Sequence, residues 1–218
     1  LWSESPSYMR TNPGVSMPPS QILKACCFLF LFAASAQNCS KDPSCAPYDG
    51  ACSPLVTVLL FQKSSKYIFL SPNATNANFG GVVGVDAFCS SNKPAALPGV
   101  GSDYKGLVMA STRNQNTNWV LQGNTEYLNE AGAVVGKTNA SKLLIFNLTN
   151  PVSAISSMVY TGIVVTDENT WTAGTTCTDW SVNISSGERG QTDSVTTTMI
   201  ANSMTSCNTM IPIYCVQQ

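Results

Sequence analysis

The side chains that most enzymes use for nucleophilic or metal chemistry are scarce in this sequence. Its 218 residues include no histidine, which excludes the Ser-His-Asp and Cys-His catalytic designs and removes the commonest metal ligand. Charged residues, 11 basic and 12 acidic, make up only 11% of the chain, less than half of the roughly 25% of an ordinary soluble domain. Because binding of phosphates needs clustered Lys and Arg, this composition argues against a nucleic-acid-binding protein.

One set of short patterns could activate a serine nucleophile. Ser90–Lys93 matches S-x-x-K, Tyr127–Asn129 matches Y-x-N, and Lys137–Asn139 approaches K-T-G, in the order used by penicillin-recognising serine enzymes. However, the glycine of K-T-G is replaced, and S-x-x-K recurs at Ser102–Lys105. Those enzymes also need a longer chain with a substantial helical domain. We therefore predict that the protein is not an enzyme and uses no cofactor.

An acidic triplet could in principle ligate a cation. Asp167, Glu168 and Asn169 are adjacent, and their oxygen atoms are of the kind that bind Ca²⁺. Such a run is more often a solvated turn, so these residues are weak metal candidates and we expect no bound metal.

An apolar run near the start of the chain predicts export. Residues 1–16 show no helical or strand periodicity and are interpreted as an over-extended reading frame, with translation starting at Met17. Residues 17–38 have the pattern of a signal peptide, because the apolar run is too short for a bilayer, which needs about 20 residues. Two processing routes remain open: cleavage before Gln37, or lipidation of Cys39 followed by a Cys- and Pro-rich tether over residues 39–65.

The number of cysteines, nine in all, favours lipidation. Cys26 and Cys27 leave with the signal, so an odd number would remain in an oxidising compartment unless Cys39 carries lipid. Cys45 and Cys52 could then close a small loop in the tether. The domain keeps Cys89, Cys177, Cys207 and Cys215. Four cysteines allow three pairings, and their spacing does not choose among them.

Residues 66–218 predict one domain of short elements. A helix is expected at about 82–92, with Val85, Phe88 and Cys89 near one face and Pro94 behind it. Short strands are expected at 67–71, 105–111, 118–122, 126–129, 142–148, 162–166 and 212–217. The polar stretch from Thr166 to Cys207 indicates a long loop rather than a sheet core. Few helices and many short strands predict an α+β fold.

The order of several segments resembles a known family. These segments are K-Y-I-F-L-S, G-G-V-V-G-V-D-A-F-C, Y-K-G-L-V-M-A-S, N-T-E-Y-L-N, Thr161-Gly162, C-T-D-W and C-N-T-M-I-P-I-Y-C-V-Q. They resemble the DUF1554 domain of spirochaetal, chiefly leptospiral, lipoproteins, which are described as endostatin-like and related to the C-type lectin fold. The resemblance covers about residues 66–218. It implies a C-type-lectin-like (endostatin-like) domain with short strands, one or two helices and long loops pinned by disulfides.

The resemblance also implies a nested pair of bridges, Cys89 to Cys215 and Cys177 to Cys207. We expect Trp171 and Trp180, which flank Cys177, to pack against the inner bridge.

Three ligand-binding properties of the relatives, for calcium, zinc and heparin, are not expected here. The E-P-N or Q-P-D loop and the W-N-D strand of calcium-dependent lectins are missing, and endostatin uses histidine for zinc and clustered arginines for heparin. The sequence has no histidine, and only Arg113 and Arg189 follow the signal, so we expect binding of neither zinc nor heparin.

Two functions remain as hypotheses. The first is an outer-membrane lipoprotein at the cell surface, anchored in the membrane by its N-terminal lipid. Its domain would bind host extracellular-matrix or plasma proteins, including complement regulators. The second is a structural or housekeeping envelope lipoprotein without a host ligand. A secreted or periplasmic protein is the alternative location. From Cys39 onward nine basic residues face eleven acidic ones, which argues against electrostatic capture of polyanions and favours contact through loops rich in Asn, Thr and Ser.

Overall fold

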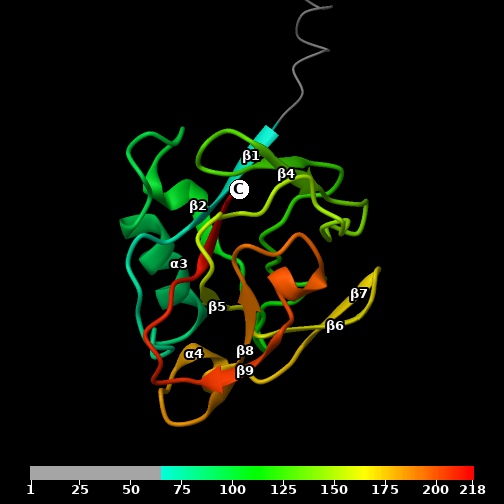
Figure 1. The fold of residues 1–218 in the computed structure, drawn as a ribbon. Coiled ribbons are helices and arrows are strands. Elements are labelled where there is room, and N and C mark those ends of the chain that lie inside the picture. Colours follow the sequence, from blue (N-terminus) through cyan, green and yellow to red (C-terminus); the bar gives the residue numbers. More distant parts are fainter. Residues whose placement is uncertain (1–64) are drawn as a thin grey trace, which may run out of the picture. The chain divides into compact units, whose positions relative to one another are not determined.

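A five-stranded sheet forms the centre of the computed structural model (Figure 1), which describes residues 65–218. Its strand order is β2-β10-β1-β3-β4, and only the β1–β3 pair is parallel. The strands are β1 (Ser65–Leu70), β2 (Tyr104–Gly106), β3 (Glu126–Leu128), β4 (Val134–Lys137) and β10 (Tyr214–Gln217). The predictions for residues 1–64, including the start, the signal, the tether and Cys39, Cys45 and Cys52, lie outside the described residues.

A smaller sheet, a hairpin and short helices complete the described part. The second sheet has the order β5-β8-β9, and β6 pairs with β7 in a hairpin that projects from the body in Figure 1. These strands are β5 (Met158–Tyr160), β6 (Ile163–Asp167), β7 (Thr170–Ala173), β8 (Ser186–Gln191) and β9 (Ser203–Ser206). The helices are α3 (Val82–Ser91), η3 (Gly101–Asp103), α4 (Cys177–Trp180) and η4 (Thr197–Met199). The domain is therefore α+β, and none of its helices is long and apolar enough to cross a membrane.

The five-stranded sheet separates two hydrophobic cores. Ile68 on β1 belongs to one cluster and its neighbour Phe69 to the other. Tyr214 and Cys215 divide in the same way on β10. This alternation follows from strand geometry, because successive side chains point to opposite faces of a sheet. Both faces of the central strands are thus buried.

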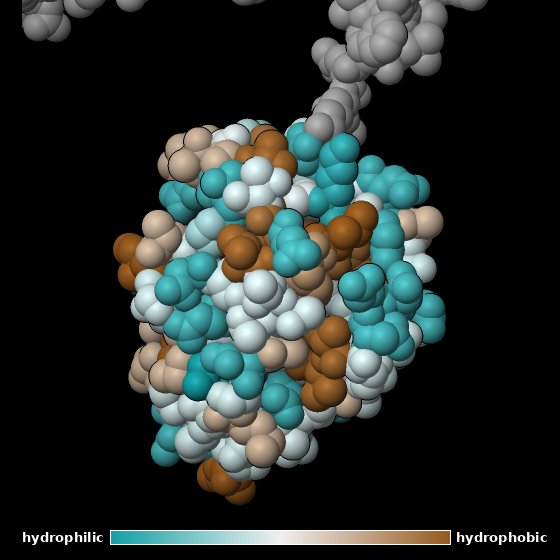
Figure 2. Space-filling view, turned by 45° about the vertical axis from the view of Figure 1, so that its right-hand side comes forward, coloured by the Kyte–Doolittle hydropathy of each residue, from teal (hydrophilic) through white to brown (hydrophobic). Residues whose placement is uncertain are grey.

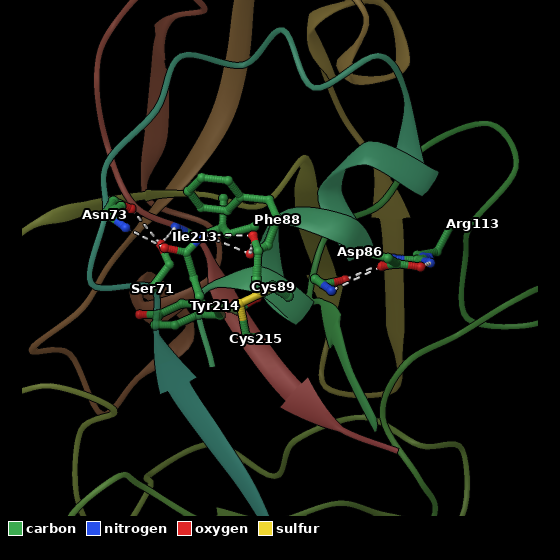
Figure 3. Close-up of a disulfide and its surroundings, with 12 residues drawn as sticks. Ser71, Asn73, Asp86, Phe88, Cys89, Arg113, Ile213, Tyr214 and Cys215 are labelled. Carbon is green, nitrogen blue, oxygen red and sulfur yellow. Dashed lines mark hydrogen bonds and ion pairs between the residues drawn. A yellow bond between two sulfur atoms is a disulfide. The ribbon is translucent and has the colours of Figure 1, made fainter. Parts of the chain in front are cut away.

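Helix α3 is fastened to the sheet at two points (Figure 3). Its buried Cys89 is bonded to Cys215 of β10. Almost one turn earlier, Asp86 accepts hydrogen bonds from Nη1 and Nη2 of Arg113 at 2.8 and 2.6 Å. The same pair joins β2, because Gly106 N–H donates to Asp86 and the Gly106 carbonyl accepts from Arg113. Helix, sheet and the segment carrying Arg113 are therefore one connected unit.

The structure forms both bridges that the family resemblance implies, Cys89–Cys215 and Cys177–Cys207. Trp180 lies in the same buried cluster as both cysteines of the inner bridge. Trp171, in contrast, belongs to the other core, so the expectation that it packs against this bridge is wrong. β7 places Trp171 beside Val165 of β6, away from the α4 turn.

The stretch from Thr166 to Cys207 is more regular than expected, since it contains β7, β8 and β9. Strand β8 lacks the alternation of large apolar residues because two of its buried positions are glycines. A Cβ on Gly190 would lie 1.8 Å from the Met199 carbonyl oxygen, and one on Gly187 would lie 2.7 Å from Cys177 Sγ. Close approach of the backbone thus replaces side-chain packing.

Two expected strands are missing from the described part. Residues 118–122 form none, and the 142–148 segment contributes only an isolated bridge between Leu144 and Thr138. Likewise, only the first part of 105–111 belongs to β2. Their apolar residues are nevertheless buried, Val120 and Leu143 among them. Hydrophobicity correctly indicated burial but not hydrogen bonding into a sheet.

Helix α4 is a turn of left-handed helix. Cys177, Thr178, Asp179 and Trp180 have φ angles between 52° and 65°, a conformation that costs roughly 1–2 kcal/mol per non-glycine residue. Three contacts hold it: the inner disulfide, a hydrogen bond from Trp180 Nε1 to the Met109 carbonyl at 2.8 Å, and the Ser111–Asp179 pair. Each joins the turn to a distant segment.

The two disulfides should differ in their contribution to stability. The outer bridge spans 126 residues and the inner one 30, which corresponds to about 5 and about 4 kcal/mol in the chain-entropy model. Replacing both cysteines of each pair by Ala and measuring urea unfolding should show the larger loss for Cys89/Cys215. An equal or reversed order would show that native contacts, not chain entropy, dominate.

Asp179 should stabilise the α4 turn only while ionised. Hydrogen bonds from the Ser111 hydroxyl and backbone N–H lower the pKa of Asp179 from its usual 3.8. A depressed pKa in the folded state means that this stability is present above pH 3.8 and is lost as the pH falls through the lowered pKa. Asp179→Asn should therefore lower the free energy of unfolding by about 1 kcal/mol near neutral pH and leave it unchanged in strong acid. Urea unfolding at both pH values measures this difference. Glu130→Gln, at an exposed position, is the control; a loss independent of pH would contradict the role of the charge.

Candidate functional site

Three segments distant in the sequence meet on one part of the surface, here called the three-loop face: residues 112–119, residues 139–146 and the β6–β7 turn at 167–169. Gln115 Nε2 lies 3.4 Å from the Asn169 carbonyl oxygen and 3.5 Å from that of Ser141. Asn139 Nδ2 donates to Asn169 Oδ1 at 3.3 Å. Amide side chains therefore link all three loops.

Trp119 fixes the relative position of two of these loops. Its indole N–H donates to the Lys142 carbonyl at 2.9 Å. Lys142 has a left-handed φ of 64°, which is uncommon outside glycine, and Asn139 closes the same turn by accepting from the Lys142 and Leu143 amides. The shape of this turn is thus fixed by hydrogen bonds within the domain.

An aromatic cluster lies beneath the three-loop face. Trp171 is 3% exposed, and Trp119 meets it edge-on with ring centroids 6.1 Å apart. Phe146 stacks on Trp171 at 5.7 Å. Trp119 and Phe146 are only partly buried, so the loops rest on a rigid apolar base that reaches the surface.

Polar atoms of the three-loop face keep unused hydrogen-bonding capacity. A Gln or Asn side chain offers two donor hydrogens and two acceptor lone pairs. The contacts of Gln115 at 3.4 and 3.5 Å are near the limit of a hydrogen bond, and the Asn116 side chain makes none with residues 65–218. Two shallow hollows, of about 260 and 220 Å³, lie beside Gln115 and beside Phe146. Such a surface can accept and donate hydrogen bonds to a partner.

The acidic triplet forms part of this face as a turn. Asp167 Oδ1 accepts from the Asn169 backbone N–H at 2.8 Å, while Asn169 Oδ1 accepts from Asn139. Glu168 is exposed and lines the hollow beside Phe146. Between residues 65 and 218, no three His, Cys, Asp or Glu side chains are grouped as metal ligands would be.

Two residues of the serine-enzyme pattern, Lys93 and Tyr127, make contacts outside it. Lys93 donates to the Pro94 and Leu97 carbonyls rather than to Ser90. Tyr127 is fully buried and accepts from the Gln122 amide, and burial raises the pKa of Tyr127 to about 12. Its hydroxyl is therefore protonated at neutral pH.

A larger hollow, of about 690 Å³, lies at the end of β1. It is lined mainly by small and apolar residues such as Leu70, Pro72 and Ile155, and its one charged lining residue is the exposed Glu130. Its lining also includes polar residues such as Ser71, Asn129 and Ser153, but it contains no aromatic side chain of the kind that Trp119 and Phe146 bring to the three-loop face.

The sequence predicted contact through loops rich in Asn, Thr and Ser, but it did not indicate which of these loops form the three-loop face. The run S-T-R-N-Q-N-T-N at 111–118 is the part of the three-loop face richest in such residues. The burial of Arg113 within this run was not predicted, because an isolated Arg among polar residues is usually exposed.

Comparison with known proteins places the chain in a family. No curated protein matches it. A model of the family described as "Protein of unknown function (DUF1554)" matches residues 72–198, which is more than half of the 218 residues. The match includes helix α3, the three-loop face and the α4 turn. The chain belongs to the DUF1554 family.

Proposed function

We propose that the protein is a surface-exposed bacterial lipoprotein that binds protein ligands through the three-loop face. The observation that carries the proposal is the convergence of three amide-bearing loops on a rigid aromatic base, with Trp119 and Phe146 only partly buried. Ligand-binding loops on a rigid scaffold are the usual arrangement in binding modules.

The chemistry of the face suits a protein partner. Protein-binding surfaces commonly combine aromatic anchors with Asn, Ser and Gly that adapt their hydrogen bonds. Figure 2 shows a molecular face on which hydrophobic side chains form small separate patches among polar ones. The near-balance of nine basic and eleven acidic residues from Cys39 onward favours such contacts over capture of polyanions. Host extracellular-matrix proteins and complement regulators are the candidate ligands.

The proposal includes a C-type-lectin-like (endostatin-like) fold of the leptospiral type. Its support is the nested bridging, in which a helix cysteine joins the last strand and encloses the Cys177–Cys207 pair. The short strands and few helices agree with that architecture. The alternative is a housekeeping envelope lipoprotein of the same family without a host ligand.

Lipid anchorage can be tested by intact mass. Protein extracted with detergent should start at Cys39, carry two or three acyl chains and contain six oxidised thiols. An unmodified chain beginning at Gln37 would instead establish a secreted or periplasmic protein.

The three-loop face can be tested with matched amide variants. We expect saturable binding of laminin, fibronectin or complement factor H by surface plasmon resonance, weakened about tenfold or more by Gln115→Ala combined with Asn116→Ala. Asn208→Ala, at an exposed amide far along the chain beside the inner bridge, should leave binding unchanged. Equal unfolding free energies would show that the loss is not misfolding.

Protease treatment of intact cells separates the two hypotheses. An adhesin should be cleaved at the surface, whereas a protein facing the periplasm should survive. Survival together with no saturable binding to any of the three ligands would favour the housekeeping alternative.

A further inference from the structure

The segment that carries Gln115 and Asn116 consists of two consecutive tight turns, at 110–113 and 114–117. In each turn the first and last residues exchange two backbone hydrogen bonds, at 2.9 and 3.2 Å in the first turn and at 2.9 and 3.0 Å in the second. Gln115 and Asn116 form the tip of the second turn. Because no residue separates the two turns, the direction of the second depends on the orientation of the first.

Two carboxylates hold the first turn. Its last residue, Arg113, is paired with Asp86 of α3. Ser111, at its tip, donates its backbone N–H to Asp179 Oδ1 at 2.8 Å and its hydroxyl to Asp179 Oδ2. Both oxygens of the Asp179 carboxylate therefore bind one residue of the turn. A turn attached at one point can pivot about it, whereas attachment at two residues fixes its orientation.

Hydrogen bonds continue from this tip into the three-loop face. Ser111 and Thr112 are both exposed, so hydrophobic packing contributes little to their position. The Thr112 carbonyl accepts from Asn118 Nδ2 at 3.1 Å. Asn118 directly precedes Trp119, whose indole N–H donates to the Lys142 carbonyl. A shift of the first turn would therefore be passed to the rest of the loop.

Asp179 itself belongs to a firmly attached part of the α4 turn. Its neighbours Cys177 and Trp180 are buried. Cys177 is bonded to Cys207, and the Trp180 indole N–H donates to the Met109 carbonyl at 2.8 Å. The left-handed backbone of this turn is costly, and such strain is concentrated at ligand clamps and other functional positions. The turn thus gives the carboxylate a rigid base.

We propose that Asp179 is a positioning residue of the three-loop face. Its carboxylate holds the turn at 110–113 in one orientation, and that turn presents Gln115 and Asn116 to the ligand. The inference rests on the proposed function and extends its site to α4, since Asp179 acts through Ser111 rather than by touching the ligand. A loop that is ordered before binding loses less conformational entropy on binding, which raises the affinity.

The variant Asp179→Gly separates the carboxylate from the shape of the α4 turn. Asp179 has a φ of 53°, and glycine adopts such angles without steric cost. The variant therefore removes the carboxylate but permits the left-handed backbone. Thr178→Gly is the matched control, because Thr178 has the same φ of 53° and is exposed. Its side chain makes no hydrogen bond with residues 65–218.

NMR relaxation of the full-length ¹⁵N-labelled chain without ligand is the first measurement. Backbone order parameters over 114–118 should be about 0.85 in the wild type and in Thr178→Gly, and should fall below about 0.6 in Asp179→Gly. Ser111→Ala, which leaves α4 unaltered, should loosen the loop in the same direction. Unchanged order parameters in Asp179→Gly, without exchange broadening on the microsecond-to-millisecond timescale, would overturn the proposal whether or not a ligand is found.

Binding kinetics by surface plasmon resonance are the second measurement. With laminin, fibronectin or complement factor H, Asp179→Gly should weaken binding about three- to tenfold, mainly through slower association, because only molecules with a correctly placed loop can bind. Gln115→Ala combined with Asn116→Ala removes contacts and should act mainly through faster dissociation. Thr178→Gly should change neither rate.

The two measurements distinguish this inference from the proposed function. An unchanged affinity of Asp179→Gly despite a loosened loop would overturn the positioning role. If the wild-type chain binds none of the three proteins, the proposed function fails, whereas a loop that loosens in Asp179→Gly and not in Thr178→Gly still supports the positioning role of Asp179.

Discussion

The ion pair between Asp86 and the buried Arg113 is the contact on which the arrangement of the domain depends, and the Asp86 side chain itself is 23% exposed. It joins helix α3 to β2 through Gly106, and nearly one helical turn later Cys89 repeats the attachment covalently to β10. Removing one partner of such a pair leaves a buried charge uncompensated, which is far more costly than losing a surface salt bridge. The pair therefore specifies one position of the helix on the sheet rather than merely adding stability.

The same pair anchors one loop of the three-loop face. Arg113 is also a member of the 112–119 loop, so its guanidinium anchors that loop to the core while the following Asn and Gln side chains remain at the surface. Just before it, Ser111 bonds Asp179 in the left-handed α4 turn. The strained turn and the loop are thus held by residues only two positions apart, and strain that persists in this way requires surroundings that over-determine it.

The anchored 112–119 loop brings Trp119 to the three-loop face. There, amide side chains from three segments lie around Trp119 and Phe146. These amides donate and accept hydrogen bonds without carrying charge, in a chain in which charged residues make up only 11%.

Local sequence patterns located β1, α3 and β10, because period and burial are encoded within a few neighbouring residues. The same patterns predicted strands at 118–122 and 142–148, where the apolar residues are buried without joining a sheet. The polar strand β8 was not predicted. Its packing depends on the close approach of Met199 and Cys177 to its glycines, which its own sequence does not indicate. The cysteine count limited the bridges to three pairings, and choosing among them required the family resemblance. The tertiary structure alone decides which amide side chains meet on the three-loop face and that Arg113 is buried against Asp86. The physical reason is that these contacts join segments far apart in the chain.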